Sequence, residues 1–168
     1  MTTSLLLLAD THIPARARRL PTAVLDAIDA ADIVVHAGDW VDVATLDLVE
    51  SRSREFHGVH GNNDGPELRE RLSEIDRFSV ETLGFAVVHE TGPAARREER
   101  MDQAFPDTDV LIFGHSHIPW DTVTPRGMRL LNPGSPTDRR RQPVCTMMSL
   151  RIDRGTLDVT LIPVSRDA

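Results

Sequence analysis

The chain has 168 residues and a net charge of −7, an ordinary length for one domain with a single core. This charge disfavours binding to nucleic acid or to an anionic membrane, and no apolar run approaches the ~18 residues needed to cross a bilayer. The only cysteine, Cys145, excludes an internal disulfide, and the N-terminal leucines run into Asp10 as a secretory signal would not. We expect a single domain, residues 1–168, located in the cytoplasm.

Three strand–helix units are predicted at the start of the chain. In each unit, a short apolar run precedes a segment with apolar residues at helical spacing. Pro21 and Pro66 stand where two of the helices begin, a position that proline favours. The predicted strands are 5–8, 32–39 and 55–62, and the predicted helices are 22–31, 42–52 and 66–74.

The rest of the chain is richer in β-structure. Residues 77–90 are predicted to form two strands joined at Leu83-Gly84, and an Arg/Glu-rich helix at 94–105 leads to a strand at 109–114. Four more strands follow, with turns at Arg126-Gly127 and Arg154-Gly155: 120–125, 128–132, 144–153 and 156–164. We expect one α/β domain in which a largely parallel first sheet packs on a more antiparallel second sheet.

Five of the apolar runs end in side chains that can bind a metal ion. Sites in α/β sheets form at the carboxyl edge, where strands about 5 Å apart can direct such groups at one point. Glycine precedes three of these positions, which allows close approach of the backbone: Gly38, Gly61 and Gly114. The candidate ligands are Asp10, His12, Asp39, Asn62, His89, His115 and His117.

These seven donors exceed what one tetrahedral ion binds. They suit two ions of five or six coordination that share one bridging carboxylate. Mixed His, Asp and Asn ligands without cysteine indicate Mn²⁺, Fe²⁺, Co²⁺, Ni²⁺ or Zn²⁺ rather than a structural thiolate zinc site, and we favour Mn²⁺. Two ions roughly 3.5–4 Å apart are the usual arrangement for hydrolysing phosphate esters.

The order of these motifs resembles that of the calcineurin-like metallophosphoesterase superfamily. The motifs are D-x-H (Asp10, His12), G-D-x-x-D (Gly38, Asp39, Asp42), G-N (Gly61, Asn62), a strand-terminal His89 and G-H-x-H (Gly114, His115, His117). With N-P-G-S from Asn132 to Ser135, they are similar to its small bacterial and archaeal phosphodiesterase branch. The resemblance covers residues 4–136 and implies a four-layer αββα sandwich of two mixed β-sheets flanked by helices.

The resemblance also implies a role for each ligand and a reaction. Asp10, His12 and His117 would hold one ion, Asn62, His89 and His115 the other, and Asp39 would bridge them. A water bridging the two ions would attack a small-molecule phosphoester, and a phosphodiester is the favoured substrate. The implied catalytic residues are Asp39, Asn62, His89 and Asn63. Since members of the family often form dimers or tetramers, the resemblance allows a homodimer or a homotetramer.

Two positions depart from the family pattern. Many members read G-N-H-[DE], where the histidine protonates the leaving group, whereas this chain has Asn63 there. An amide does not usefully donate a proton at neutral pH, so we expect better activity on aryl diesters than on poorer leaving groups. Glu90 follows His89 where glycine is expected. Its carboxylate either orients His89 or points to solvent, and its charge favours diesters over dianionic monoesters.

Other polar residues have simpler structural explanations. His36, His57 and His60 lie within apolar runs, so we expect them to be structural. Asp42 either caps the following helix or takes part in catalysis. Trp40, next to Asp39, either lines the cleft or fills the core.

Two arginine-rich loops could meet a phosphate, and we expect them to be solvated instead. They contain Arg16, Arg18 and Arg19, and Arg139 to Arg141. The main rival to catalysis is a metal-binding protein-interaction scaffold of the same fold with weak or no activity. A metal-dependent protease or amidohydrolase is disfavoured, because the chain has no H-E-x-x-H motif and no lysine.

Overall fold

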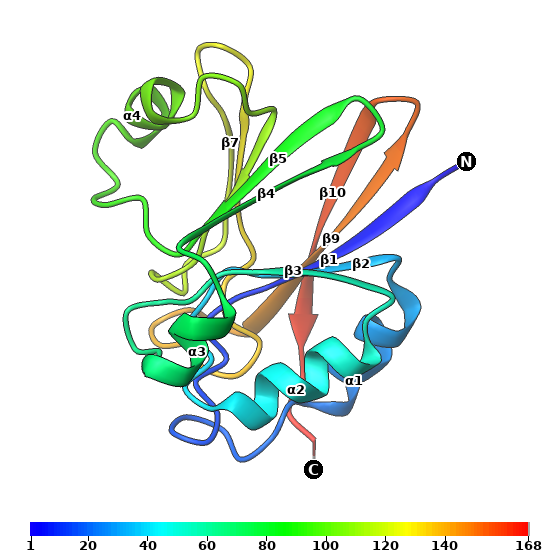
Figure 1. Ribbon diagram of the computed structural model, residues 1–168, viewed down its shortest axis with the longest axis vertical. Helices are drawn as coiled ribbons and strands as arrows, with labels where there is room; N and C mark the ends of the chain where they lie inside the picture. Colours follow the sequence, from blue (N-terminus) through cyan, green and yellow to red (C-terminus); the bar gives the residue numbers. More distant parts are fainter. Residues whose placement is uncertain (168) are drawn as a thin grey trace.

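The computed structural model describes residues 1–167 and contains two five-stranded sheets packed on each other (Figure 1). The strand order is β10-β9-β1-β2-β3 in the first sheet and β4-β5-β6-β8-β7 in the second. The strands are β1 (Thr3–Leu8), β2 (Ile33–His36), β3 (Glu55–Gly58), β4 (Ile75–Val80), β5 (Leu83–Val88), β6 (Val110–Ile112), β7 (Trp120–Val123), β8 (Arg129–Asn132), β9 (Cys145–Asp153) and β10 (Thr156–Val164). The helices are α1 (Thr22–Ala30), α2 (Val43–Arg52), α3 (Pro66–Arg71) and α4 (Arg97–Ala104).

Alternating side chains of β1 build two separate apolar layers. Leu5 and Leu7 lie in the core between the sheets, together with Val87 of the second sheet. Leu6 and Leu8 point the other way, into a core formed with α1, α2 and α3. The buried run of four leucines therefore packs on both of its faces, as a central strand between two layers must.

A third apolar cluster lies on the outer face of the second sheet. Leu111 and Leu130 pack there against Met101 and Phe105 from α4 and its C-terminal end. Helices thus cover both outer faces of the sheet pair, with α1 and α2 on one side and α4 on the other (Figure 1). The four-layer αββα sandwich that the resemblance implies is confirmed.

The expectation of a largely parallel first sheet and a more antiparallel second sheet is wrong. Although β7 and β8 lie in the second sheet, β9 and β10 belong to the first, where β9 pairs antiparallel with β1. Both sheets are therefore mixed. Met148 and Leu150 of β9 extend the core between the sheets beside Leu5 and Leu7. Without β9, the apolar β1 would be an exposed edge strand.

The turn between β4 and β5 also differs from the prediction. It lies at Glu81-Thr82, where Glu81 has a φ of 54° and Val80 pairs with Leu83. Gly84 lies inside β5 instead, and its N–H donates to the Asp109 carboxylate at 2.6 Å. The glycine therefore lies within the strand rather than in the turn.

Several elements are shorter than predicted. The third strand ends at Gly58 rather than at residue 62, α3 ends at Arg71 rather than 74, and α4 begins at Arg97 rather than 94. The early end of β3 leaves residues 59–64 free to form a loop. None of the four helices within residues 1–167 is long and apolar enough to cross a membrane.

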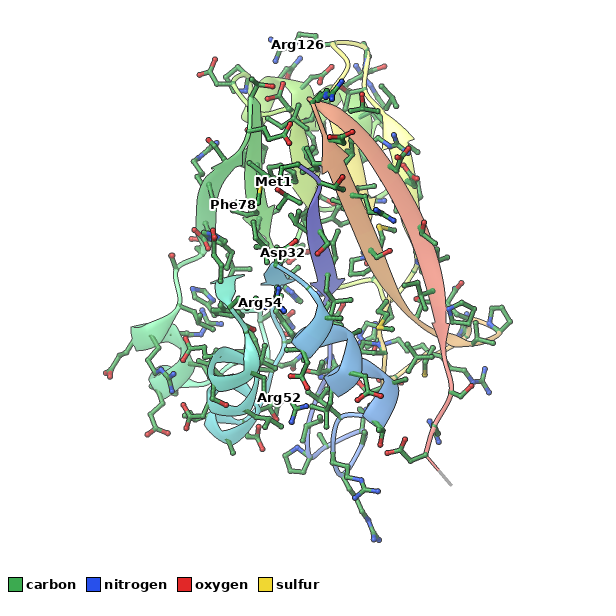
Figure 2. The ribbon with its side chains drawn as sticks, turned by 90° about the vertical axis from the view of Figure 1, so that its right-hand side faces the viewer. Met1, Asp32, Arg52, Arg54, Phe78 and Arg126 are labelled. Atoms are coloured by element: carbon green, nitrogen blue, oxygen red, sulfur yellow. The ribbon has the colours of Figure 1, made fainter. Side chains whose placement is uncertain are left out.

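The molecule is longer along the sheets than across them. Figure 2 shows Arg126, in the β7–β8 turn, at one end, and Arg52, on α2, toward the other. The carboxyl ends of β1, β2 and β3 lead to the side of α3 and of the loop before β9 (Figure 1). The predicted ligands follow these strand ends.

Candidate metal centre

All seven predicted ligand side chains lie together at the carboxyl ends of five strands. Three of these strands, β1, β2 and β3, belong to the first sheet, and β5 and β6 belong to the second. The site therefore lies along the seam between the sheets. Its residues come from distant parts of the chain, as the 105 positions between Asp10 and His115 illustrate.

The first donor group consists of Asp10, His12 and His117, whose candidate ligand atoms all lie within 4.8 Å of one another. Oδ1 of Asp10 lies 3.9 Å from Nε2 of His12 and 3.7 Å from Nε2 of His117. These three atoms are buried, and they make no hydrogen bond within residues 1–167. Buried polar atoms nearly always have a hydrogen-bond partner. Three unpaired ligand atoms that face one another therefore fit a bound cation.

The second donor group consists of Asp39, His89 and His115. Asn62 completes it, since its Oδ1 lies 2.9 Å from Nε2 of His89 and 3.0 Å from Nδ1 of His115. Those two imidazole nitrogens are 3.3 Å apart. Oxygen and nitrogen donors thus converge on one point here as well.

Asp39 connects the two groups. Its Oδ2 lies 3.4 Å from Nε2 of His12 and 3.4 Å from Nε2 of His89. Asn63 holds this carboxylate from the other side, donating from its backbone N–H to Oδ1 at 2.9 Å and from Nδ2 to Oδ2 at 2.8 Å. A carboxylate equidistant from a donor of each group has the position that a bridging ligand needs.

Backbone carbonyls fix the orientation of two of the imidazoles. Nδ1 of His89 donates to the carbonyl oxygen of Ala37 at 2.7 Å, and Nδ1 of His117 donates to that of Asp138 at 2.6 Å. Each ring thereby holds a proton on Nδ1, and Nε2 is the nitrogen that faces the site.

Five of the seven ligand residues have a left-handed backbone conformation, which non-glycine residues rarely adopt. Each such residue costs roughly 1 kcal/mol or more and persists only where the surrounding structure imposes it. Their φ values are 55° at Asp10, 45° at His12, 63° at Asp39, 71° at His115 and 59° at His117. Strain of this kind is concentrated at functional sites.

Burial strongly perturbs the charges of the site. Desolvation raises the pKa of Asp10 to about 8 and lowers the pKa of His117 to about 4. Burial also acts to raise the pKa of Asp39, but hydrogen bonds and charge from His89, with hydrogen bonds from Asn63, hold it well below its usual range. The imidazole of His117 is therefore neutral at pH 7, the form that binds metal, and a cation would restore the charge of Asp10.

Asp64 organises the site without being one of the seven ligands. Its carboxylate accepts hydrogen bonds from the backbone N–H groups of Gly61 at 2.7 Å, Val41 at 2.8 Å and Asp39 at 3.0 Å. It thereby fixes the loops that carry Asp39 and Asn62. No role is predicted for Asp64 from the sequence, although its place at the end of GNND, three residues after Gly61, is the available signal.

The loop between β8 and β9 ties the strand ends together. Oγ of Ser135 donates to the carbonyl oxygen of Asp10 at 2.7 Å, and Oγ1 of Thr137 donates to that of Thr11 at 2.6 Å. Nδ2 of Asn132 donates to the carbonyl oxygen of Gly114 at 3.0 Å. In the sequence, N-P-G-S is only a marker of the family. In the structure, its Asn132 and Ser135 hold the loops that carry the candidate ligands.

The two open alternatives, for Trp40 and Asp42, can now be decided, and His36 has the structural role expected of it. His36 is buried, accepts from the N–H of Gly38 through Nδ1 at 3.1 Å, and stacks on Trp40 with ring centroids 3.5 Å apart. Trp40 is fully buried and therefore fills the core. Asp42 caps α2, its Oδ1 accepting from the N–H of Thr45 at 2.9 Å.

Glu90 lies beside His115 rather than His89. Its Oε1 is 3.8 Å from Nε2 of His115, and both side chains are partly exposed. The carboxylate thus faces the outer side of the imidazole whose Nδ1 points at Asn62. Its negative charge stands at the entrance to the second donor group.

Two open pockets flank Asp39. One, of about 340 Å³, adjoins Asn62 and His89. The other, of about 360 Å³, adjoins His12 and Asn63. The wall of the first includes apolar and acidic side chains: Glu74, Ile75, Val88, Glu90 and Phe105.

An αββα sandwich with two adjoining donor groups at the carboxyl ends of its strands is the architecture of a metal-dependent phosphoesterase. The chain belongs to the calcineurin-like phosphoesterase superfamily, whose domain matches residues 4–155. It is 35% identical to a probable metallophosphoesterase of Methanocaldococcus jannaschii over 158 residues, which cover 94% of this chain and 79% of the relative. It is 38% identical to a probable metallophosphoesterase of Methanothermobacter thermautotrophicus over 160 residues, covering 92% and 89%.

Solved structures are similar over nearly the whole chain. A Thermotoga maritima protein, determined by NMR in solution, is 34% identical with a TM-score of 0.77, covering 96% of this chain and 99% of that one. Wild-type Vps29 of Entamoeba histolytica, complexed with Zn²⁺, is 24% identical with a TM-score of 0.76, covering 96% and 99%. The likeness to Vps29 is one of fold.

Proposed function

We propose that this protein is a phosphodiesterase that uses two divalent metal ions, with Mn²⁺ as the favoured metal. The observation that supports this most directly is the position of Asp39, with Oδ2 3.4 Å from a histidine nitrogen of each donor group. The unpaired, buried ligand atoms of the first group also support it, because a cation is a partner that suits their chemistry.

Residues around the site hold the ligand side chains in a fixed orientation. A pair of divalent ions bound there would supply Lewis-acid stabilisation of the phosphoryl charge and would lower the pKa of a water nucleophile. Asn63 orients Asp39, while carbonyl oxygens orient His89 and His117, so little reorganisation is needed during the reaction. The amide of Asn63 does not supply a proton to the leaving group, which favours substrates such as aryl esters.

Two features favour diesters over monoesters. A phosphodiester has two substituents, and the pockets on the two sides of Asp39 can each accept one. In addition, the Glu90 carboxylate near His115 repels the second negative charge of a monoester more than the single charge of a diester.

A comparison of bis(p-nitrophenyl) phosphate with p-nitrophenyl phosphate tests this proposal. EDTA-treated protein should be inactive, and Mn²⁺, Ni²⁺, Co²⁺, Zn²⁺ and Mg²⁺ should be added back separately. We expect Mn²⁺ to restore hydrolysis, with kcat/KM about tenfold higher for the diester, the factor given by about 1.4 kcal/mol. Failure of every metal to restore turnover would refute the activity, and a preference for the monoester would refute the substrate class.

A metal-binding scaffold with weak or no catalysis is the second candidate function. The fold shared with Vps29 is compatible with either role. Metal analysis combined with the assay separates them. Two bound ions with turnover of the diester support the enzyme, whereas two bound ions without turnover of any phosphoester support the scaffold.

A further inference from the structure

The pocket beside the first donor group adjoins a second, basic pocket. Arg16 and Arg140 line the pocket near the donor group, and Arg16, Arg18, Arg19 and Arg166 line the adjoining one, of about 230 Å³. Arg16 belongs to both walls, so the two pockets are neighbours. We call these five side chains, together, the arginine groove. The loop after β1 and the C-terminal segment, which supply most of them, lie at the same end of the molecule (Figure 1).

Few carboxylates neutralise the arginine groove. Asp138 lies 3.7 Å from Nε of Arg16. The Asp167 carboxylate lies 3.7 Å from Nη2 of Arg19. It also accepts a hydrogen bond at 3.1 Å from the backbone N–H of Thr22, at the start of α1. These are the two acidic residues lining either pocket, so five arginines face two carboxylates. This local excess of positive charge contrasts with the net charge of −7 of the chain.

The pocket on the other side of Asp39 has the opposite character. Its walls include Glu74 and Glu90. The one arginine lining it, Arg69, directs its guanidinium at the carbonyl oxygens of Asp64 at 2.7 Å and Gly61 at 3.0 Å. This guanidinium is therefore committed to the backbone. The charges of the two sides therefore favour an anionic substituent on the side of the arginine groove.

We propose that the arginine groove binds a second phosphate group, carried on one arm of the phosphodiester substrate. This inference rests on the proposed phosphodiesterase activity. Guanidinium groups bind phosphate through charge-assisted, often bidentate hydrogen bonds, and more than one can share a phosphate. Arg140 lines the pocket beside His12, and its Nη1 lies 3.5 Å from the carbonyl oxygen of His115, a longer contact than those of Arg69. The substrate class is then a diester with an additional phosphate on one side and an uncharged arm on the other.

Two synthetic diesters test the arginine groove. They are thymidine 5′-(p-nitrophenyl phosphate) and the same compound with a 3′-phosphate. With Mn²⁺ bound, we expect the KM of the 3′-phosphorylated compound to be about tenfold lower than that of the compound without the 3′-phosphate. This factor is at the low end for a charge-assisted contact, because the arginines are partly exposed to solvent. This preference should shrink as salt concentration rises.

Substitutions in the arginine groove should remove the preference. Arg16→Gln, whose side chain is 67% exposed, should reduce the tenfold ratio of KM values, and Arg16→Gln combined with Arg140→Gln should bring it to about one. The matched control is Arg154→Gln in the β9–β10 turn, at the far end of these strands, which should keep the ratio. Equal KM values in the unsubstituted protein, or an unchanged ratio in the double variant, would overturn the proposal.

Equilibrium binding separates this inference from the proposed activity. Thymidine 3′,5′-bisphosphate should bind to the Mn²⁺-loaded protein about tenfold more tightly than thymidine 5′-monophosphate, and the double variant should lose this difference. If neither diester is hydrolysed, the proposed activity fails while this comparison still tests the arginine groove. Equal affinities for the two nucleotides would overturn it.

Discussion

Asp39 is the single residue on which both donor groups depend. Replacing it with alanine removes the carboxylate that lies 3.4 Å from both His12 and His89. We expect Asp39→Ala to bind fewer than two ions and to lose about 10²-fold or more of the diesterase activity. Metal analysis of the purified variant, with the bis(p-nitrophenyl) phosphate assay, measures both effects.

Asp42 provides the matched control, since it is a nearby aspartate whose carboxylate caps α2. Asp42→Ala should lower the free energy of unfolding by about 1 kcal/mol and leave the metal content unchanged. Normal turnover with full metal content in Asp39→Ala would refute the bridging assignment.

Asn63 offers a gain-of-function experiment. Its side chain lies against Asp39, at the edge of the pocket that adjoins His12. Asn63→His would place an imidazole there that can protonate a leaving group, and general acids typically contribute 10²–10⁴-fold. We expect at least about a tenfold rise in the rate for an alkyl diester and little change for an aryl diester. An unchanged ratio of alkyl to aryl rates would show that residue 63 does not set the leaving-group preference.

His36 should make stability depend on pH. Burial lowers its pKa well below 6.5, so below about pH 6.5 the unfolded chain binds a proton that the folded protein does not. Stability is therefore lost as the pH falls, by at most about 1.4 kcal/mol per pH unit from this residue. Asp10, whose pKa is raised to about 8, acts in the opposite sense, because the folded state retains its proton.

The contribution of His36 is isolated by comparison with His36→Gln. Urea unfolding of both metal-free proteins at pH 7.5 and pH 5.5 gives two differences in stability. The unsubstituted protein should lose more stability on acidification than the variant. Identical losses would mean that His36 titrates normally in the folded protein.

The candidate ligands were predictable from sequence because each is part of a short motif directly after an apolar run. The residues that support them were not. Thr137 reaches Thr11 across 126 positions, and Ser135 reaches Asp10 across 125. Hydrogen bonds between such distant loops follow from the packing of the whole fold, and no local pattern encodes them.

At the level of elements, apolar continuity located the strands but not their partners. The four leucines of β1 indicate a strand buried on both faces. Nothing in the local pattern of β9 or β10 indicates that they return to β1, because strand pairing is decided by complementary burial across the sheet. The β4–β5 turn was misplaced because Glu81, a residue type that rarely adopts a positive φ, forms it with a φ of 54°.

The loop between β8 and β9 should tune metal affinity. Ser135 donates to the carbonyl oxygen of Asp10 and accepts from the N–H of Asp138 at 2.8 Å, so it links two segments that hold the first donor group. We expect Ser135→Ala to weaken Mn²⁺ binding about tenfold and to lower the free energy of unfolding by about 1 kcal/mol. Calorimetric titration with Mn²⁺ measures the affinity.

Ser51→Ala is the control for this loop. Its hydroxyl donates to a backbone carbonyl on α2, at an exposed position that is not part of the site. It should bind Mn²⁺ normally. An unaltered Mn²⁺ affinity in Ser135→Ala would show that the loop does not influence the donors.

At the scale of the whole molecule, metal binding should stabilise the fold. The donors come from both sheets, and unfolding separates them, so the unfolded chain lacks the site. Mn²⁺ at 100 times its Kd should add about 2.7 kcal/mol to the free energy of unfolding for one site. Thermal unfolding with Mn²⁺ and with EDTA measures the shift, and Asp39→Ala should show a smaller one. Identical transitions with and without Mn²⁺ would contradict a metal centre in the folded protein.

The strained ligand positions have an evolutionary consequence. Glycine adopts a positive φ about as readily as a negative one, so it would relieve the backbone at Asp10, His12, Asp39, His115 and His117. The backbone conformation alone would therefore favour glycine at those positions, by roughly 1 kcal/mol each. If a descendant of this chain no longer needed to bind metal ions, we expect these positions to be replaced by glycine over time. Such a descendant should become more stable as it loses its activity.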